Sequence, residues 1–276
     1  MVDYYSQRAT AGLVLTEATS ISEAAHGWRN APLICTPEHA QGWKKVVNCV
    51  HEKDSVIFLQ LWHLGRQAHS SFHPSTNKTF SASDIPMAGH VKTIEGVNVD
   101  AEVPSPMTVE EIKQTVQDYV AAAQLCKEAG FDGVEIHAAN GYLLDQFLQS
   151  SSNVRTDEYG GSVENRARFL LEVFDAIVES GSYPADRIGF RISPNGAFGG
   201  RGSEDYFDAF LEVARLMNTR KPAYLHIMDG LGFGYHEMSP VVTTMDMKKV
   251  FDGPIIANVG LTKDMAEGMI RSGATD

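Results

Sequence analysis

The stretch "GVEIHAANGYLLDQF" (133–147) combines a short apolar run with a polar corner. Val134 and Ile136 alternate with a carboxylate and an imidazole, as expected for a strand whose two faces meet different surroundings. An Asn-Gly pair at 140–141 then marks a turn, and a tyrosine leads the next apolar run. The stretch therefore predicts a buried strand that ends in a polar turn.

Short apolar runs of this kind recur along the chain and alternate with longer helical patterns. Strand–helix alternation with nearly continuous apolar strands is typical of a parallel sheet. The predicted strands are "GLVLTEA" (12–18), "VIFLQLWHLG" (56–65), "GVEIHA" (133–138), "IGFRISP" (188–194), "AYLHIMD" (223–229) and "PIIANVG" (254–260).

The helices between these strands have recognisable starts. A threonine before a proline, as at 36–37, indicates an N-cap followed by the first helical residue. A threonine three residues before Glu111 predicts a capping box. The predicted N-caps are Thr36, Thr108, Ser162 and Thr262.

Polar residues gather at the carboxyl ends of several different strands. This distribution is typical of a (β/α)₈ or TIM-type barrel, whose active site lies at that rim. No GxGxxG or GxxxxGK[ST] follows any strand, so dinucleotide-binding and P-loop folds have little support. We expect one α/β barrel domain over residues 1–276, with the region 66–107 passing over its mouth as a candidate lid. The rim residues are Glu17, Gln60, His63, His137, Arg191, His226 and Asn258.

The composition narrows the class of function. The net charge is -12 and the basic residues are scattered, so the sequence predicts neither a nucleic-acid partner nor an anionic membrane surface. No apolar run approaches the roughly 18 residues of a membrane helix. Cys35, Cys49 and Cys126 show no paired spacing, which favours reduced thiols and a cytoplasmic location.

The polar corner after 133–138 has a chemical interpretation. An imidazole N–H from His137 and an amide N–H from Asn140 can both donate to one oxygen and stabilise negative charge on it. Tyr142 adds a donor that is protonated at neutral pH. This set suits protonation of the carbon next to a polarised carbonyl. His137 and Asn140 could instead be a structural pair that ties the loop to backbone carbonyls.

Other positions allow two interpretations each. Arg191 is either one half of an ion pair or a fixed cation beside a delocalised anion. The Gln60 amide, a donor and an acceptor, matches the edge of a flavin pyrimidine ring. "ANVGLT" (257–262) is either a plain turn or a phosphate site at a helix N-terminus.

Three histidines lie between residues 60 and 75 and are candidate metal ligands. Their spacing fits neither one helix face nor one strand, and no carboxylate accompanies them. We therefore expect no metal site at His63, His69 and His73.

Longer stretches resemble the Old Yellow Enzyme family of FMN-dependent ene-reductases, and the resemblance runs along essentially the whole chain. The central block, residues 130–173, matches the family over a much longer stretch than a short motif does. The resembling stretches are "YYSQRATAGLVLTEAT" (4–19), "WKKVV…FLQLWHLGR" (43–66), "GFDGVEIHAANGYLLDQFLQSSSNVRTDEYGGSVENRARFLLEV" (130–173) and "GFRISP" (189–194).

The resemblance implies an activity and a set of site residues. FMN, reduced by NAD(P)H, would transfer hydride to the β-carbon of an α,β-unsaturated carbonyl compound. His137 and Asn140 would bind the carbonyl oxygen, and Tyr142 would protonate the α-carbon. The implied flavin contacts are Ala18, Gln60, Arg191, Val259 and Gly260, and the implied substrate pocket consists of Trp28, Trp62, His137, Asn140 and Phe198.

The sequence departs from the family pattern at its two ends. The family's first strand and last strand are absent, so six strands are expected where a closed barrel has eight. The family's flavin-binding threonine and phosphate-binding arginine are absent with them. We therefore expect the chain alone to be poorly soluble, weakly yellow or colourless, and low in activity. A flavin-free remnant that acts as an interaction protein and a metal-assisted barrel hydrolase are the alternatives.

Overall fold

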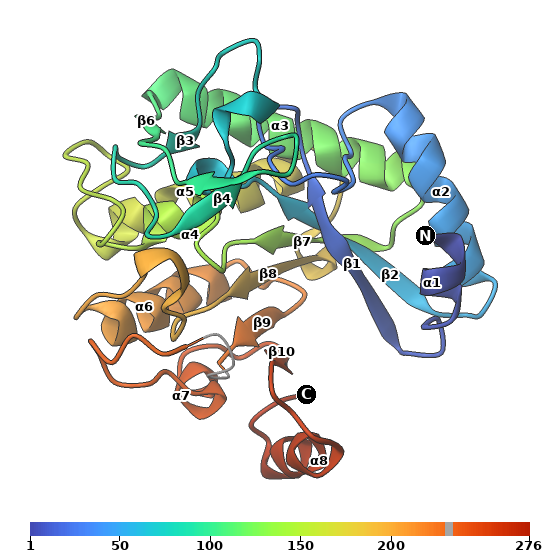
Figure 1. Cartoon of the computed structure of the whole chain (residues 1–276). Coiled ribbons are helices and arrows are strands. Elements are labelled where there is room, and N and C mark those ends of the chain that lie inside the picture. Colours follow the sequence, from blue (N-terminus) through green and yellow to red (C-terminus); the bar gives the residue numbers. More distant parts are fainter. Residues whose placement is uncertain (230–233) are drawn as a thin grey trace.

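A curled parallel sheet organises the chain (Figure 1). The computed structural model describes residues 1–229 and 234–276. All six predicted strands are confirmed, and their order across the sheet follows the chain, as in a partial (β/α)₈ barrel. They are β1 (Leu13–Ser20), β2 (Val56–Trp62), β7 (Gly133–His137), β8 (Ile188–Ile192), β9 (Leu225–Met228) and β10 (Ile255–Asn258).

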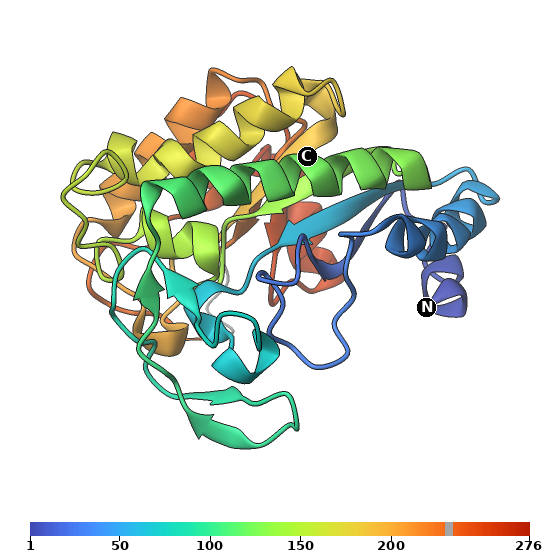
Figure 2. The same ribbon diagram turned by 90° about the horizontal axis from the view of Figure 1, so that it is seen from above.

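Helices follow the strands, and the longest of them, α3 and α5, lie side by side across the sheet (Figure 2). Among the described residues, no helix combines the length and the apolar character needed to span a membrane. The helices are α1 (Val2–Ser6), α2 (Pro37–His51), α3 (Val109–Ala129), α4 (Leu143–Leu148), α5 (Val163–Glu179), α6 (Tyr206–Asn218), α7 (Thr244–Lys248) and α8 (Lys263–Ser272).

The predicted N-caps are confirmed in the structure. The Oγ1 of Thr36 accepts a hydrogen bond from the backbone N–H of His39 at 3.3 Å. Thr108 and Glu111 form the reciprocal capping box at the start of α3. Ser162 and Thr262 cap α5 and α8, each accepting one backbone N–H with its side-chain oxygen, without a reciprocal capping box. Each cap satisfies a backbone N–H that the helix itself leaves without a partner.

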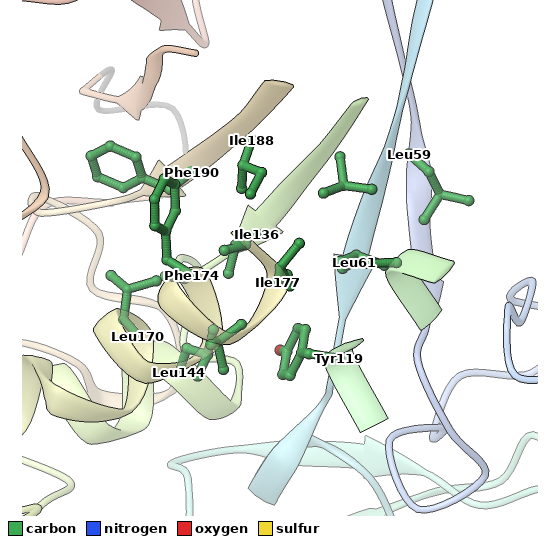
Figure 3. Packing of buried hydrophobic residues seen from close by; sticks show 14 of the residues in the cluster. Leu59, Leu61, Tyr119, Ile136, Leu144, Leu170, Phe174, Ile177, Ile188 and Phe190 are labelled. Atoms are coloured by element: carbon green, nitrogen blue, oxygen red, sulfur yellow. The ribbon is translucent and has the colours of Figure 1, made fainter. Parts of the chain in front are cut away.

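The main core lies between the outer face of the sheet and these helices. Ile136 of β7 packs among Phe174 and Ile177 of α5, with Tyr119 of α3 close by (Figure 3). Val134 belongs to the same cluster. The predicted alternation along β7 is therefore confirmed, because its apolar residues face the helices and its polar residues face the barrel interior.

Two aromatic rings fill part of the barrel interior. Phe58 of β2 and Tyr224, just before β9, have ring centroids 6.0 Å apart. Each ring lies where a glycine leaves room on a neighbouring strand. A Cβ on Gly133 would be 2.4 Å from Cζ of Phe58, and one on Gly189 would be 2.2 Å from Cζ of Tyr224. These glycines are needed for space rather than for backbone freedom.

The region predicted as a lid contains short elements but no α-helix. β3 pairs with β6 in parallel, and β4 pairs with β5 in an antiparallel hairpin. Ala88 donates to the backbone oxygen of Gly199 at 3.0 Å, which joins this region to the loop after β8. Its role as a lid remains a prediction. The elements are η1 (Gly65–Gln67), η2 (Ser70–Phe72), β3 (Phe80–Ser81), β4 (His90–Lys92), β5 (Asn98–Asp100) and β6 (Ser105–Pro106).

The close packing of Gly189 against Tyr224 gives a stability prediction. We expect Gly189→Ala to lower the free energy of unfolding by about 1–3 kcal/mol, because the added methyl group overpacks a buried ring. Urea unfolding followed by circular dichroism measures this change. Gly42→Ala on α2 is the control, because a Cβ there meets no atom within 4 Å. Equal stability of the two variants would contradict the packing argument.

Candidate active site

A cavity of about 420 Å³ opens at the carboxyl ends of the first strands. It brings together all three residues predicted to be catalytic and most of those predicted to bind the cofactor or substrate. Four lining residues were not predicted: Glu17, which the sequence placed only at the rim, and the loop residues 29–31. The cavity is lined by Glu17, Ala18, Trp28, Arg29, Asn30, Ala31, Gln60, Trp62, His137, Asn140, Tyr142 and Arg191.

A second, smaller cavity of about 210 Å³ shares Asn140 and Tyr142 with the first. Phe198 lines this second cavity and not the first. The two cavities therefore meet at the polar corner after β7. The second cavity is lined by Gln67, Asn140, Tyr142, Phe198, Arg201 and Met228.

Three rings form the centre of the site. Tyr142 stands edge-on between Trp62 and His137, with ring centroids 5.0 Å apart in both pairs. Burial lowers the pKa of His137 well below its usual value, and the nearby Arg191 cation acts in the same direction. Burial raises the pKa of Tyr142. At neutral pH the site therefore holds a neutral imidazole and a protonated phenol.

The backbone of Asn140 has a left-handed conformation, with φ of 60°. Its N–H donates to Oγ of Ser193 at 2.7 Å, and its carbonyl accepts from Nε2 of Gln67 at 2.7 Å. Asparagine tolerates this conformation better than most residues. Both backbone groups of Asn140 are thus held by side chains, which leaves its carboxamide at the junction of the two cavities.

Gly141 is also left-handed, with φ of 78°, and is held in the same manner. Its N–H donates to Oδ2 of Asp145 at 2.6 Å, and its carbonyl accepts from Nε2 of Gln146 at 2.7 Å. Asp145 follows Gly141 by four residues, at the start of α4. That spacing is the signal by which the sequence could have identified it.

Arg201 connects the two halves of this corner. Its Nη1 lies 3.2 Å from Oδ2 of Asp145 and 2.7 Å from Oγ of Ser193, and both charged side chains are almost fully buried. Burial raises the pKa of Asp145, and the Arg201 guanidinium opposes that rise. Sequence reasoning missed Arg201, because it lies in a loop 56 residues beyond Asp145.

Arg191 projects from β8 into the larger cavity. Its Nη2 donates to Oδ1 of Asn258 at 2.9 Å, and within the described ranges no carboxylate forms an ion pair with it. The interpretation of Arg191 as half of an ion pair is therefore not supported. Its buried Nε has no hydrogen-bond partner among the described residues.

Several other buried polar atoms of the cavity are also without partners in the part of the chain that is described. They are Nδ1 of His137, Oδ1 of Asn140 and Nε1 of Trp62. Buried polar atoms are normally hydrogen-bonded, so unpaired atoms on residues that line this cavity leave hydrogen-bonding capacity that a polar ligand there would use. A flat flavin ring, with donors and acceptors along its edge and apolar faces, fits this set of residues.

The predicted phosphate loop lies directly after β10. Val259 and Gly260 are both left-handed, with φ of 79° and 74°. A β-branched residue in this region is strained, and such strain is concentrated at functional sites. Neither residue lines the two cavities at the polar corner. Their role in phosphate binding remains a prediction.

The three candidate metal-binding histidines, His63, His69 and His73, are engaged in local hydrogen bonds. His63 accepts from the backbone N–H of Gly65, and both ring nitrogens of His73 face backbone carbonyls, at 2.8 and 2.6 Å. Nδ1 of His69 accepts from the backbone N–H of Ser71. In residues 1–229 and 234–276, no group of three or more His, Cys, Asp or Glu side chains could hold a metal ion.

Comparison with known proteins identifies the family. The family model described as "NADH:flavin oxidoreductase / NADH oxidase family" matches residues 1–275. The chain is 45% identical over 234 residues to the flavin oxidoreductase hxnT of Emericella nidulans, covering 83% of this chain and 59% of that protein. It is 38% identical over 281 residues to a probable flavin mononucleotide-dependent alkene reductase of Leishmania infantum, covering 100% and 75%.

Solved structures agree with the sequence matches. An old yellow enzyme homologue from Zymomonas mobilis has a TM-score of 0.93 at 35% identity, covering 100% of this chain and 76% of that one. Morphinone reductase has a TM-score of 0.90 at 36% identity, covering 99% and 74%. The chain thus spans 59% of the length of hxnT and about three quarters of the length of the other relatives. It belongs to the NADH:flavin oxidoreductase / NADH oxidase family, as a member of the Old Yellow Enzyme group.

Proposed function

We propose that this protein is an FMN-dependent NAD(P)H oxidoreductase that reduces the C=C bond of α,β-unsaturated carbonyl compounds. The observation that carries the proposal is the meeting of His137, Asn140 and Tyr142 in one cavity with Gln60 and Arg191. A carbonyl-binding pair, a proton donor and a flavin-binding edge are the parts that this reaction requires.

The described activities of the relatives support the same chemistry. They include the Leishmania alkene reductase and plant proteins named 12-oxophytodienoate reductase, one of which, from Arabidopsis thaliana, is 36% identical over 275 residues. Morphinone reductase has been solved in complex with tetrahydroNAD, which supports a nicotinamide reductant. The interaction-protein and hydrolase alternatives receive no support from these relatives.

His137 and Asn140 would bind the substrate carbonyl oxygen. Neutral His137 carries one N–H, and the Asn140 amide carries two, so both side chains can donate to the same oxygen. Donors held in place before the reaction stabilise the enolate-like charge that develops there. The hydrogen bonds to the Asn140 backbone keep its carboxamide at the cavity junction.

Tyr142 would protonate the α-carbon of the substrate. Its raised pKa keeps the proton on the phenol at neutral pH. The edge-on contacts with Trp62 and His137 fix the ring next to the carbonyl-binding pair. A proton donor held beside a polarised carbonyl can complete the reduction at the carbon next to it.

Gln60, Arg191 and Ala18 would hold the ring system of FMN, which supplies the hydride when it has been reduced by NAD(P)H. Gln60 offers a donor and an acceptor to the ring edge, and the Arg191 cation stabilises negative charge on the ring. Val259 and Gly260 would bind the phosphate end. Trp28, Trp62 and Phe198 would line the substrate pocket.

Trp28 and Phe198 are half exposed, so they would stand at the rim of that pocket rather than inside it.

The three cysteines are unpaired, which supports a reducing compartment and a cytoplasmic location.

The cofactor assignment predicts a visible signature. Because the family's first and last strands are absent, we expect the purified chain, after incubation with FMN and removal of the excess, to retain only weak flavin absorbance. Its NADPH oxidation should be slow but should speed up when cyclohexenone is added. Absorbance spectroscopy and a steady-state assay measure both properties. A chain that retains no flavin and shows no enone-dependent oxidation would contradict the proposed function.

The carbonyl-binding pair predicts a loss of ligand affinity. His137→Ala combined with Asn140→Gly removes both donors, and glycine still accepts the left-handed backbone at 140. We expect enone turnover to fall by about 10²–10³ for each donor removed. Titration with a phenol, read as a charge-transfer band of the bound flavin, should show no binding. An unchanged band in the double variant would overturn the assignment.

Removing one oxygen atom tests the proton donor independently of this carbonyl-binding pair. Tyr142→Phe keeps the ring packing against Trp62 and His137 and removes only the hydroxyl group. In stopped-flow measurements, flavin reduction by NADPH should persist while flavin reoxidation by the enone slows by roughly 10²–10⁴-fold. If both half-reactions slow equally, Tyr142 is a structural residue.

A further inference from the structure

Glu135 is a buried carboxylate that the proposed chemistry does not use. It projects from β7 into the barrel interior, and its side chain is fully buried. Its Oε1 accepts from Nε2 of Gln60 at 2.6 Å, and its Oε2 lies 2.9 Å from Nδ1 of His226. An unpaired carboxylate in such a place would be costly, so these two contacts explain how it is accommodated.

The contacts keep Glu135 ionised. Burial by itself would raise the pKa of this carboxyl group, but His226, Gln60 and the Arg191 cation outweigh burial and bring the pKa to about 2. A carboxylate without a proton can only accept hydrogen bonds. The groups that face it must therefore donate.

This requirement fixes the direction of the Gln60 carboxamide. Gln60 and Glu135 are register partners on the neighbouring strands β2 and β7. Because the Glu135 oxygen can only accept, Gln60 must turn its NH₂ group toward it. One N–H and the carbonyl oxygen of Gln60 then remain for a ligand in the cavity that Gln60 lines. Without the carboxylate, the amide could also adopt the flipped orientation.

His226 keeps the carboxylate in place from the other side. It lies on β9, in register with Arg191 of β8, and its Nδ1 must carry the proton that Glu135 accepts. The three residues of this hydrogen-bonded series come from β2, β7 and β9, so the orientation of the Gln60 amide depends on three strands.

We propose that Glu135 is a positioning residue that orients the Gln60 carboxamide, so that Gln60 presents an acceptor beside a donor to the imide edge of the flavin ring. This inference rests on the proposed function, because it takes FMN as the occupant of the cavity. The recognised chemical group is a ring N–H next to a ring carbonyl. A flavin methylated at that nitrogen would lose the hydrogen bond to the Gln60 oxygen.

A purely structural role for Glu135 predicts a different result. If Glu135 only held β2 to β9 across the barrel interior, its replacement would weaken all flavins equally and would lower the stability of the fold. A positioning role acts through Gln60 and depends on the ring nitrogen. The preference for FMN over its N3-methyl analogue therefore separates the two roles.

The test measures dissociation constants for FMN and N3-methyl-FMN by flavin fluorescence quenching, using the full chain. The variants are Glu135→Gln, Gln60→Ala and the double variant, with thermal unfolding as a control for stability. We expect the original chain to prefer FMN by about tenfold, the value of one hydrogen bond. Glu135→Gln should abolish most of that preference, because a glutamine can accept or donate toward Gln60 and allows both orientations. In the Gln60→Ala background, Glu135→Gln should have no further effect.

Each outcome decides a separate point. The inference is overturned if Glu135→Gln still prefers FMN over N3-methyl-FMN. It is also overturned if Glu135→Gln changes this preference equally in the original chain and in the Gln60→Ala variant. If Glu135→Gln does not fold, Glu135→Asp keeps the charge, withdraws the acceptor from Gln60 and should show the same loss of preference. Failure of the original chain to bind FMN overturns the proposed function and this inference together.

Discussion

The site depends on one constraint, which is the left-handed corner of two residues after β7. Asn140 and Gly141 both have positive φ, and side chains bind all four of their backbone polar groups. Ser193 and Gln67, which are distant in sequence, hold Asn140, and Asp145 and Gln146 of the following helix α4 hold Gly141. An unrestrained chain would not keep an asparagine in this conformation, because the left-handed region is sparsely populated. The corner separates the strand that carries His137 from the helix that Tyr142 begins. The relative positions of the imidazole, the carboxamide and the phenol all follow from it.

Arg201 links the side chains that hold the two residues of this corner. It bonds both Ser193, which accepts from the Asn140 N–H, and Asp145, which accepts from the Gly141 N–H. A buried ion pair of this kind is a weak source of net stability, because the cost of removing two charges from water offsets their attraction. Its value here is geometric, since one guanidinium fixes two acceptors relative to each other. The same principle applies to Glu135, whose negative charge determines which atom of Gln60 turns away from the cavity.

The sequence predicted the parts of the fold that depend on local pattern. The strands followed from apolar runs and the helix starts from capping residues, because both signals lie within a few neighbouring positions. His137, Gln60 and Arg191 were found because they lie on the inward face of strands, near the ends that meet at one rim. Arg201, which a loop brings in, was missed because it lies 56 residues from Asp145 and no local pattern links the two. His226 was predicted at the rim, but its contact with Glu135, 91 residues away, was not. The phosphate loop at Val259 was proposed from local geometry, but neither cavity at the polar corner includes it.

The edge-on packing of Tyr142 between Trp62 and His137 has a consequence for the product of the reaction. A phenol held by two rings cannot swing around its substrate, so its hydroxyl group approaches from one side only. A proton given from one side to a prochiral carbon creates a single configuration there. In the proposed reaction, for a substrate held in one orientation, the configuration at the α-carbon therefore depends on these two aromatic contacts, and an enlarged gap beside either ring would lower the enantiomeric purity of the product.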